Sequence, residues 1–256
     1  MYAVNPLQLE TEAAKAGIES SELEVPPRVI LTFSKIIADE LTRIHDLEEW
    51  KWPVPRVSPY ASPRKLLRGR IESNEIAVVF PPMGASPLAA LCEELIHFGC
   101  SAIILACASW SLGDDILPRG TIHLPTFATG IDGTSPHYGN TTANVSPKEQ
   151  TLQIMRETMA TEEIESKEGG VGSFEAIYRI RESDIEQFRM QGCLSVENGE
   201  VATLYSISHV LDVPIGVLLQ PYLDLRDGWT LGYMDEKYRS TCILQANLSV
   251  KMVLHM

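Results

Sequence analysis

Two apolar segments near the middle of the chain give the clearest pattern in the sequence. Residues 75–80 (EIAVVF) and 101–108 (SAIILACA) are almost continuously apolar, which is typical of strands covered on both faces. The stretch 86–99 between them reads as a helix, with Ser86 as a predicted N-cap and Pro87 at the first helical position. A strand, a helix and a second strand in this order predict parallel strands joined by a right-handed crossover.

Strands and helices alternate along the rest of the chain as well. Residues 1–25 are expected to form a loosely ordered acidic arm. The whole chain, 1–256, is predicted to form a single α/β domain with a mixed sheet and helices on both sides. The remaining expected elements are a strand and then a helix in 28–44, a proline-rich extended connector at 50–65, a strand pair in 120–134, strands at 166–178 and 213–222, and helices at 145–164, 183–192, 200–212 (amphipathic) and 238–256.

Charge and composition narrow the range of functions. The net charge of −13 disfavours nucleic acid and anionic membranes as partners, because both carry negative charge. No segment is apolar and long enough to span a membrane, and the N-terminus lacks the pattern of a signal peptide. The five cysteines are scattered and odd in number, which favours reduced, buried thiols in a cytoplasmic protein. No cysteine or histidine spacing typical of a zinc site occurs, so no metal is expected.

Four segments in order resemble the nucleoside phosphorylase family, which includes purine nucleoside and uridine phosphorylases. Residues 78–95 (VVFPPMGASPLAALCEEL) are similar to the family's strand, glycine-containing turn and helix, and residues 99–120 are similar to its next strand and loop. Residues 128–138 (ATGIDGTSPHY) resemble the DGTS-x-HY segment of the uridine phosphorylase-like branch. Residues 193–219 resemble the VEMEAAALY helix and the strand that follows it.

The resemblance implies a fold, a reaction and an assembly. The fold is a three-layer α/β architecture around a mixed, twisted β-sheet flanked by helices, as in phosphorylases and related hydrolases. The reaction is phosphorolysis, in which a nucleoside and phosphate give a free base and ribose 1-phosphate. Phosphate is then a co-substrate, and no further cofactor is expected. The partners implied are a nucleoside or free base and further copies of the chain, as a dimer or a hexamer built from dimers.

The ribose site implied by the resemblance is present in the sequence. Glu200 falls where the family's ribose-binding glutamate falls, five residues before Tyr205. Gly199 takes the place of the methionine that packs under the sugar, and Asn198 replaces the acidic residue two places before Glu200. A glutamate at the start of a helix is also stabilised by the helix dipole, so an ordinary structural role for Glu200 is the alternative.

The phosphate site implied by the resemblance is degenerate. The family's phosphate-binding arginine on the strand is Leu105 here, and its Gly-Thr/Ser-Cys-Gly stretch is Cys107–Trp110, so two glycines that let the backbone approach an anion are lost. The predicted remnants of this site are Gly84, Ser109, Trp110 and Arg68. Arg68 belongs to the basic run SPRKLLRGR, which in hexameric relatives corresponds to a region that supplies an arginine to a neighbouring subunit. The alternative is a solvated, charged strand edge.

The base site implied by the resemblance is also altered. Ile177 stands in the position of the stacking phenylalanine, with Tyr178 next to it, and Asp224 lies about one place from the aspartate of purine-specific relatives. Gln220 and Pro221 break the usual pattern of the strand end. These three residues, Ile177, Tyr178 and Asp224, are the predicted base-binding residues, and the choice between purine and pyrimidine stays open.

Three functions follow from this combination. The first is a divergent nucleoside phosphorylase. The second is a nucleosidase, in which water replaces phosphate and no arginine is needed. The third is an inactive member of the family that binds a ligand or serves as an oligomeric partner, because a fold alone does not establish an activity.

Overall fold

The computed structural model of the protein describes residues 3–58, 62–141, 144–228 and 232–256. Its helices are α1 (Leu7–Lys15), α2 (Ser20–Leu23), α3 (Lys35–His45), α4 (Ala85–His97), α5 (Glu149–Thr161), α6 (Glu182–Met190), α7 (Glu200–Val210) and α8 (Glu236–His255). Its strands are β1 (Arg28–Leu31), β2 (Glu48–Glu49), β3 (Lys65–Ile71), β4 (Asn74–Phe80), β5 (Ala102–Ser111), β6 (Ile122–Ile131), β7 (Asn144–Val145), β8 (Ser166–Phe174), β9 (Cys193–Glu197) and β10 (Ile215–Asp224). Short 3₁₀ turns lie at Val54–Arg56, Ser135–Tyr138, Ile177–Arg179 and Gly232–Met234.

The strands form one mixed sheet with the order β10-β6-β8-β9-β5-β1-β4-β3-β2. The neighbours β4, β1, β5 and β10 are parallel, as the sequence pattern predicts, whereas β3 and β9 run antiparallel to β4 and β5. Strand β10 also pairs with β6, so β10, β6, β8, β9 and β5 close on themselves into a small barrel at one end of the sheet.

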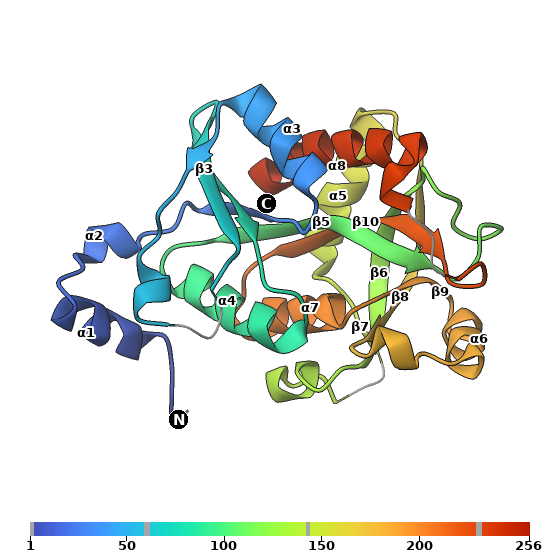
Figure 1. The fold of residues 1–256 in the computed structure, drawn as a ribbon, viewed down its shortest axis with the longest axis horizontal. Coiled ribbons are helices and arrows are strands. Elements are labelled where there is room, and N and C mark those ends of the chain that lie inside the picture. Colours follow the sequence, from blue (N-terminus) through green and yellow to red (C-terminus); the bar gives the residue numbers. More distant parts are fainter. Residues whose placement is uncertain (1–2, 59–61, 142–143, 229–231) are drawn as a thin grey trace.

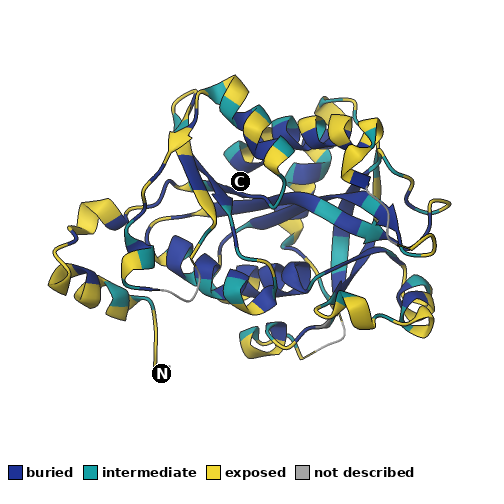
Figure 2. Cartoon of the chain, viewed as in Figure 1, coloured by how far each residue is buried: buried dark blue, intermediate teal, exposed yellow. Residues whose placement is uncertain are grey.

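Helices cover both faces of the sheet, and alternate residues of each strand pack against different helices (Figure 1). On β1, Val29 and Leu31 belong to the apolar core formed with α4 and α7, whereas Ile30 belongs to the core formed with α3, α5 and α8. The central strands are therefore buried on both sides, which Figure 2 shows as a dark band through the molecule. The predicted three-layer α/β architecture is confirmed.

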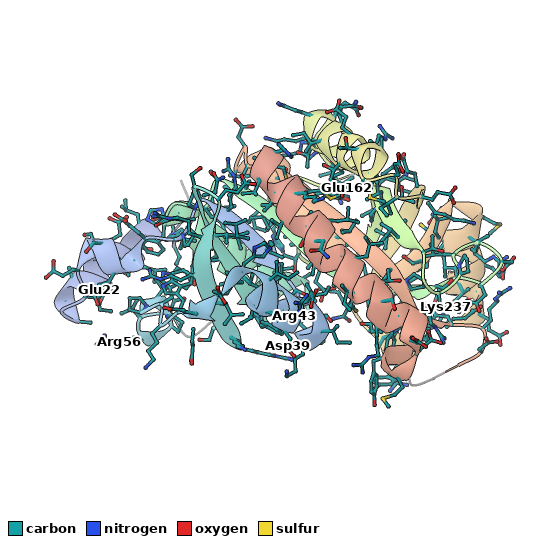
Figure 3. The ribbon with its side chains drawn as sticks, turned by 90° about the horizontal axis from the view of Figure 1, so that it is seen from above. Glu22, Asp39, Arg43, Arg56, Glu162 and Lys237 are labelled. Atoms are coloured by element: carbon teal, nitrogen blue, oxygen red, sulfur yellow. The ribbon has the colours of Figure 1, made fainter. Side chains whose placement is uncertain are left out.

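Charged side chains lie on the outer faces of the helices. Figure 3 shows Asp39 and Arg43 on the outside of α3 and Lys237 at the start of α8, and all three are exposed. The side chain of Lys251 pairs with Glu162, which joins α8 to the end of α5. Among the described residues, no helix combines the length and the apolar character that a membrane crossing requires.

The N-terminal segment differs from the loosely ordered arm expected from its composition. Within the described part of 1–25, α1 and α2 form, and Ala13, Ile18 and Leu23 are buried in the same apolar core as residues of α4. Trp52 fixes this segment further, because its indole N–H donates to the carbonyl of Leu23 at 2.9 Å. The acidic residues of the arm face solvent while its few apolar residues anchor it, and composition alone does not separate the two.

Two element boundaries and the burial of one helix also differ from the sequence predictions. Helix α4 begins at Ala85 with Gly84 as its N-cap, two residues before the predicted cap Ser86. The stretch predicted as a strand pair is the single strand β6, which absorbs Pro125 through an irregularity in its register with β8. The sequence predicts an amphipathic α7, but its residues 200–208 are all buried, because α7 lies between the sheet, α4 and the 3₁₀ turn at Ser135–Tyr138.

Candidate functional site

A pocket of about 430 Å³ opens at the carboxyl ends of the parallel strands. Phe33 and Ser34 follow β1, Met83 follows β4, and Tyr222 lies near the end of β10. This edge of a parallel sheet is where α/β proteins usually bind ligands, because several loops meet there. The described lining consists of Phe33, Ser34, Met83, Cys107, Ala108, Trp110, Ile177, Glu197, Asn198, Glu200, Tyr222 and Tyr238.

Glu197, the last residue of β9, is a buried glutamate that lines this pocket. Its Oε2 atom accepts the backbone N–H of Glu200 at 2.6 Å, and its Oε1 atom accepts the hydroxyl of Ser173. Burial, followed by the charge of the Glu200 carboxyl, raises the pKa of Glu197 well above its ordinary value. Glu197 therefore retains its proton at a pH where an exposed glutamate is ionised.

Glu200 is the first residue of α7, and the residue is only 5% exposed. Its Oε1 atom accepts the backbone N–H of Gly84 at 2.9 Å, which ties the start of α7 to the start of α4. The two carboxyls of Glu197 and Glu200 are close enough to interact directly. Two adjacent carboxyls in a dry site favour one negative charge over two, since like charges repel.

The turn between these two carboxyls depends on Gly199. This residue is the N-cap of α7 and has a φ of 90°, in the left-handed region that favours glycine. A Cβ atom at this position would lie 2.8 Å from Cγ of Glu175 and 3.2 Å from Cβ of Ala85. Gly199 thus allows a sharp change of direction from β9 into α7, with a carboxyl buried on either side.

Glu197 is the site residue that the sequence analysis missed. The family motif has an acid two places before Glu200, where this chain has Asn198. In the structure the acid is three places before Glu200, because Asn198 and Gly199 together bridge β9 and α7. The available signal was the position of Glu197 at the end of an apolar run, immediately before a glycine-containing turn.

The electrostatic character of the pocket is set by these carboxyls. Burial, and then the charges of Glu200 and Glu197, raise the pKa of the Cys107 thiol well above its ordinary value, so this cysteine is neutral. None of the described lining residues is an arginine, a lysine or a histidine. The pocket therefore combines aromatic and apolar walls with negative charge and has no cationic side chain in its described lining, which suits a neutral ligand with hydroxyl groups better than an anion.

Comparison of the chain with known proteins identifies its family. The sequence profile of the phosphorylase superfamily matches residues 27–249. The chain belongs to the phosphorylase superfamily. This result confirms the family inferred from the four sequence segments. A search of curated proteins found no significant match to the chain.

Solved structures of superfamily members share the fold at low sequence identity. Purine nucleoside phosphorylase from Toxoplasma gondii, in complex with immucillin-H, is 17% identical with a TM-score of 0.73, over 91% of this chain and 93% of that chain. Uridine phosphorylase from Vibrio fischeri is 15% identical with a TM-score of 0.75, over 92% and 95%. The 5′-methylthioadenosine/S-adenosyl homocysteine nucleosidase from Campylobacter jejuni is 14% identical with a TM-score of 0.72, over 90% and 100%. The fold is thus shared with phosphorylases and with a nucleosidase.

The residues predicted as remnants of a superfamily phosphate site are not brought together. The N–H of Gly84 is used by Glu200, and Ser109 is buried with its hydroxyl donating to the carbonyl of Gln220 at 3.4 Å. Trp110 lines the pocket, whereas Arg68 is exposed on β3, paired with Ala77 of β4. Because the backbone N–H of Gly84 already donates to a carboxylate, it is not available to bind a phosphate.

The predicted base-binding residues also separate in space. Ile177 lines the pocket, whereas the neighbouring side chain of Tyr178 is 85% exposed. Asp224 is buried, but it is not among the lining residues. Its carboxylate accepts hydrogen bonds from the backbone and guanidinium of Arg226 and from the N–H of Asp114 at 2.8 Å.

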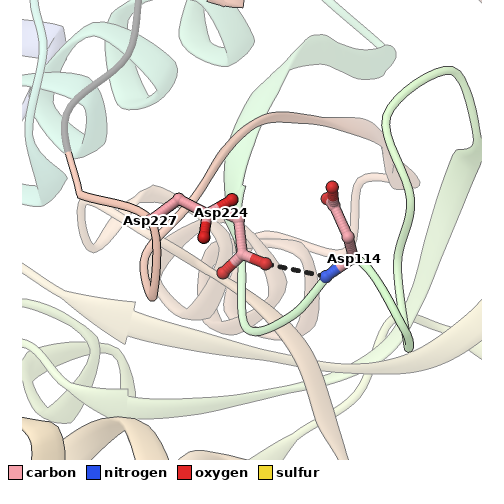
Figure 4. A group of neighbouring side chains, drawn as sticks. All are labelled: Asp114, Asp224 and Asp227. Carbon is pink, nitrogen blue, oxygen red and sulfur yellow. Dashed lines mark hydrogen bonds between the residues drawn. The ribbon is translucent and has the colours of Figure 1, made fainter.

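Asp224 belongs to a second group of acidic residues, shown with Asp114 and Asp227 in Figure 4. Burial raises the pKa of Asp224, but the hydrogen bonds from Arg226 and Asp114 outweigh it, and the pKa lies below its ordinary value. Arg226 also pairs with Asp115 at 2.8 Å. These contacts satisfy the hydrogen-bonding capacity of the buried Asp224 carboxylate within the protein. They also link the segment that follows β5 to the end of β10, which is a structural role for the cluster.

Proposed function

We propose that the pocket binds a nucleoside and cleaves its N-glycosidic bond with water, without phosphate. The observation that carries this proposal is the lining itself, in which Glu197 and Glu200 are buried and no described side chain is cationic. The superfamily includes both phosphorylases and nucleosidases among the structures that share this fold. Of the three functions that the sequence leaves open, hydrolysis is the catalytic one that needs no phosphate-binding cation, and the described lining contains none.

The lining supports a nucleoside as the ligand. Trp110 and Ile177 provide an apolar surface for a planar base, and the ring of Tyr222 adds an aromatic face near the end of β10. Glu200 provides a carboxylate acceptor for sugar hydroxyls, in the role that the family resemblance assigns to it. A volume of about 430 Å³ is in the range of small-molecule sites.

Charge favours water over phosphate as the nucleophile. A phosphate ion entering the pocket meets the negative charge of the Glu197 and Glu200 pair in a medium of low dielectric constant. Sites that bind phosphate normally offer backbone N–H groups and an arginine. Here the N–H of Gly84 is occupied by Glu200, and the arginine position of the motif is Leu105. Water carries no charge and meets neither obstacle.

The proposed reaction consumes only the nucleoside and water. The water oxygen bonds to C1′ of the ribose, the C1′–N bond breaks with its electron pair going to the base, and the proton released by water ends on the base. The sugar carries partial positive charge as the bond breaks, and a carboxylate at Glu200 stabilises that charge. The same charge that repels phosphate therefore lowers the barrier for loss of the base.

A second candidate is nucleoside binding without turnover. Glu197 accepts hydrogen bonds from Ser173 and from the backbone of Glu200, and Glu200 accepts one from Gly84. Carboxyls engaged in this way are less able to activate a water molecule. Phosphorolysis, the third candidate, requires a cation from outside the described lining, such as Arg68 of another copy in a homo-oligomer.

The cellular setting is proposed on the same basis. All five cysteines are free and buried, which supports a reducing compartment such as the cytoplasm. Assembly into a dimer, or a hexamer built from dimers, rests on the family resemblance. Size-exclusion chromatography with light scattering gives the number of copies directly.

The test is release of free base from a panel of purine and pyrimidine nucleosides, with and without phosphate, followed by liquid chromatography. Hydrolysis predicts free ribose and a rate that is the same under both conditions. Ribose 1-phosphate formed only with phosphate present would replace the proposal by phosphorolysis. Binding by calorimetry with no release leaves the second candidate. Glu200→Ala should abolish the activity, and Glu182→Ala, at the first position of α6, is the matched control.

A further inference from the structure

Asp224, the acidic residue nearest to the motif position for the base, has no proton to give in this protein. Departure of an uncharged base normally needs an acid, which protonates the base as the C1′–N bond breaks. The Asp224 carboxylate accepts the backbone N–H of Asp114 at 2.8 Å and a guanidinium N–H of Arg226 at 3.0 Å. Burial alone would raise the pKa of Asp224, but these hydrogen bonds bring it below its ordinary value. Asp224 is therefore an ionised carboxylate, and it lies outside the described lining.

The titratable groups that do line the pocket are poor proton donors to a base. Burial raises the pKa of Cys107, Tyr222 and Tyr238, so these groups hold their protons tightly at neutral pH. Glu197 keeps a proton, but its oxygens already take part in hydrogen bonds within the protein, and its side chain also hydrogen bonds to the carboxyl of Glu200. The proton therefore stays between the two carboxyls. Such a pocket favours a base that leaves without being protonated.

The aromatic part of the lining attracts positive charge. The electron-rich faces of aromatic rings bind cations, and tryptophan and tyrosine do so best. The rings of Tyr222 and Tyr238 lie 5.6 Å apart at an angle of 75°, so the lining contains aromatic rings in two orientations. The aromatic residues of the described lining are Phe33, Trp110, Tyr222 and Tyr238.

The charged groups around the pocket favour a cation as well. Glu197 and Glu200 supply negative charge, and the described lining contains no arginine, lysine or histidine that would repel a positive ligand. The charge of Arg119 acts on Tyr222, but its guanidinium pairs with Asp235 at 3.2 Å, which balances that charge. The net charge of −13 also draws cations toward the protein.

We propose that the substrate of this site is a cationic nucleoside, whose base already carries a fixed positive charge as an N-alkylated purine or a pyridinium ring does. This inference rests on the proposed hydrolysis of nucleosides and adds to it the class of base. The aromatic rings and the carboxyls attract a charged base, and such a base leaves as a neutral molecule without an acid.

The reaction of a cationic nucleoside balances without a proton on the base. The oxygen of water bonds to C1′, and the C1′–N bond breaks with its electron pair going to the ring nitrogen, which cancels the positive charge of the base. Water loses one proton, which passes to the carboxyl pair and then to solvent. The products are the free sugar, a neutral base and one proton.

The test uses pairs of nucleosides that differ in the charge of the base. 7-Methylguanosine and nicotinamide riboside are the cations, and their uncharged partners are guanosine and the reduced 1,4-dihydro form of nicotinamide riboside. Liquid chromatography on reactions of the full-length protein gives kcat and KM for each, after subtraction of the rate without protein. The variant is Trp110→Leu, and the matched control is Phe98→Leu, at the C-cap of α4 outside the described lining. Thermal unfolding checks that both variants are folded.

The expected result is a kcat/KM at least about a hundredfold higher for each cation than for its uncharged partner, since a general acid normally contributes about 10²–10⁴-fold. Trp110→Leu should raise the KM of the cations about tenfold, and that of the uncharged partners less, through loss of a cation–π contact. Phe98→Leu should leave both unchanged.

Two results would overturn the inference and leave nucleoside hydrolysis in place. Equal kcat/KM values for charged and uncharged partners would mean that an acid in the pocket serves neutral bases. An equal rise in KM for both partners in Trp110→Leu would mean that the pocket does not recognise the charge, and that the faster release reflects only the lability of the cations. If no nucleoside of either charge loses its base, the proposed function and this inference both fail.

Discussion

The Oε2 atom of Glu197 accepts the backbone N–H of Glu200 at 2.6 Å, so one carboxyl of the pocket holds the backbone that carries the other. Ser173 of β8 donates to the second oxygen of Glu197, and the same hydroxyl accepts the N–H of Ala202 at 3.2 Å. The start of α7 is therefore fixed to β8 and β9 by polar contacts. These contacts fix the position of Glu200 in the pocket, in addition to the packing of the buried helix α7.

Replacement of Glu197 by glutamine is expected to change how stability depends on pH. Burial, followed by the charge of Glu200, raises the pKa of Glu197 in the folded state. The unfolded protein then loses this proton first, and wild-type stability falls as the pH rises above about 4.5, the ordinary value. The glutamine side chain of Glu197→Gln has no proton to lose and keeps an acceptor for the N–H of Glu200. Urea unfolding between about pH 5 and pH 8 should show the variant losing less stability than the wild type.

The exposed residue Glu182 gives the control for this measurement. Glu182→Gln removes a carboxyl at the first position of α6 without touching a buried group, so its stability should follow the wild type across the pH range. Parallel declines for the wild type and Glu197→Gln would mean that the proton is not held at Glu197.

His123 should give the opposite dependence on pH. Its ring is fully buried inside the small barrel, with Nδ1 3.1 Å from the hydroxyl of Ser195 and Nε2 3.4 Å from the carbonyl of Gly169. Burial lowers the pKa of His123 from 6.5 to about 4. The unfolded state binds a proton more readily between these values, so stability falls as the pH drops through this window, by about 3 kcal/mol in all.

The His123→Gln variant tests this expectation, since glutamine can make similar hydrogen bonds and does not titrate. Its stability should lose that part of the acid sensitivity between about pH 6.5 and pH 4, while His137→Gln, at an exposed position, should behave as the wild type. An unchanged acid profile in His123→Gln would show that other groups cause the loss of stability.

Gly199→Ala should cost more stability than an alanine at a comparable glycine. Gly199 and Gly139 have φ values of 90° and 80°, but a Cβ atom at 199 meets Cγ of Glu175 at 2.8 Å and one at 139 has nothing within 4 Å. Gly139→Ala should lose about 1 kcal/mol from backbone strain alone. Gly199→Ala should lose clearly more and should weaken nucleoside binding, because α7 and Glu200 must shift. Urea unfolding and calorimetry measure the two effects, and equal losses would argue against the close contact.

Sequence patterns predict the fold and part of the site, and the reasons for the difference are local. The apolar runs that form β4 and β5 and the helix between them are predicted because burial on both faces leaves a strong signal. Glu197 was missed because a two-residue turn shifts the acid by one place relative to the motif. Asp224 lies near the motif position, but Arg226 holds its carboxylate outside the pocket lining. A motif gives the order of residues along the chain, and such side-chain pairings are not visible in it.

Trp110 tests whether the pocket wall or the charge excludes phosphate. The sequence motif has a glycine at this position, and the indole ring now lines the pocket. Trp110→Ala should weaken nucleoside binding about tenfold or more through loss of an aromatic surface, and Trp110→Phe should restore most of the affinity. Neither variant should bind phosphate in calorimetry, because the enlarged pocket still contains the Glu197 and Glu200 pair and gains no cation. Phosphate binding by Trp110→Ala would mean that the ring, and not the negative charge, excludes the anion from this strand end.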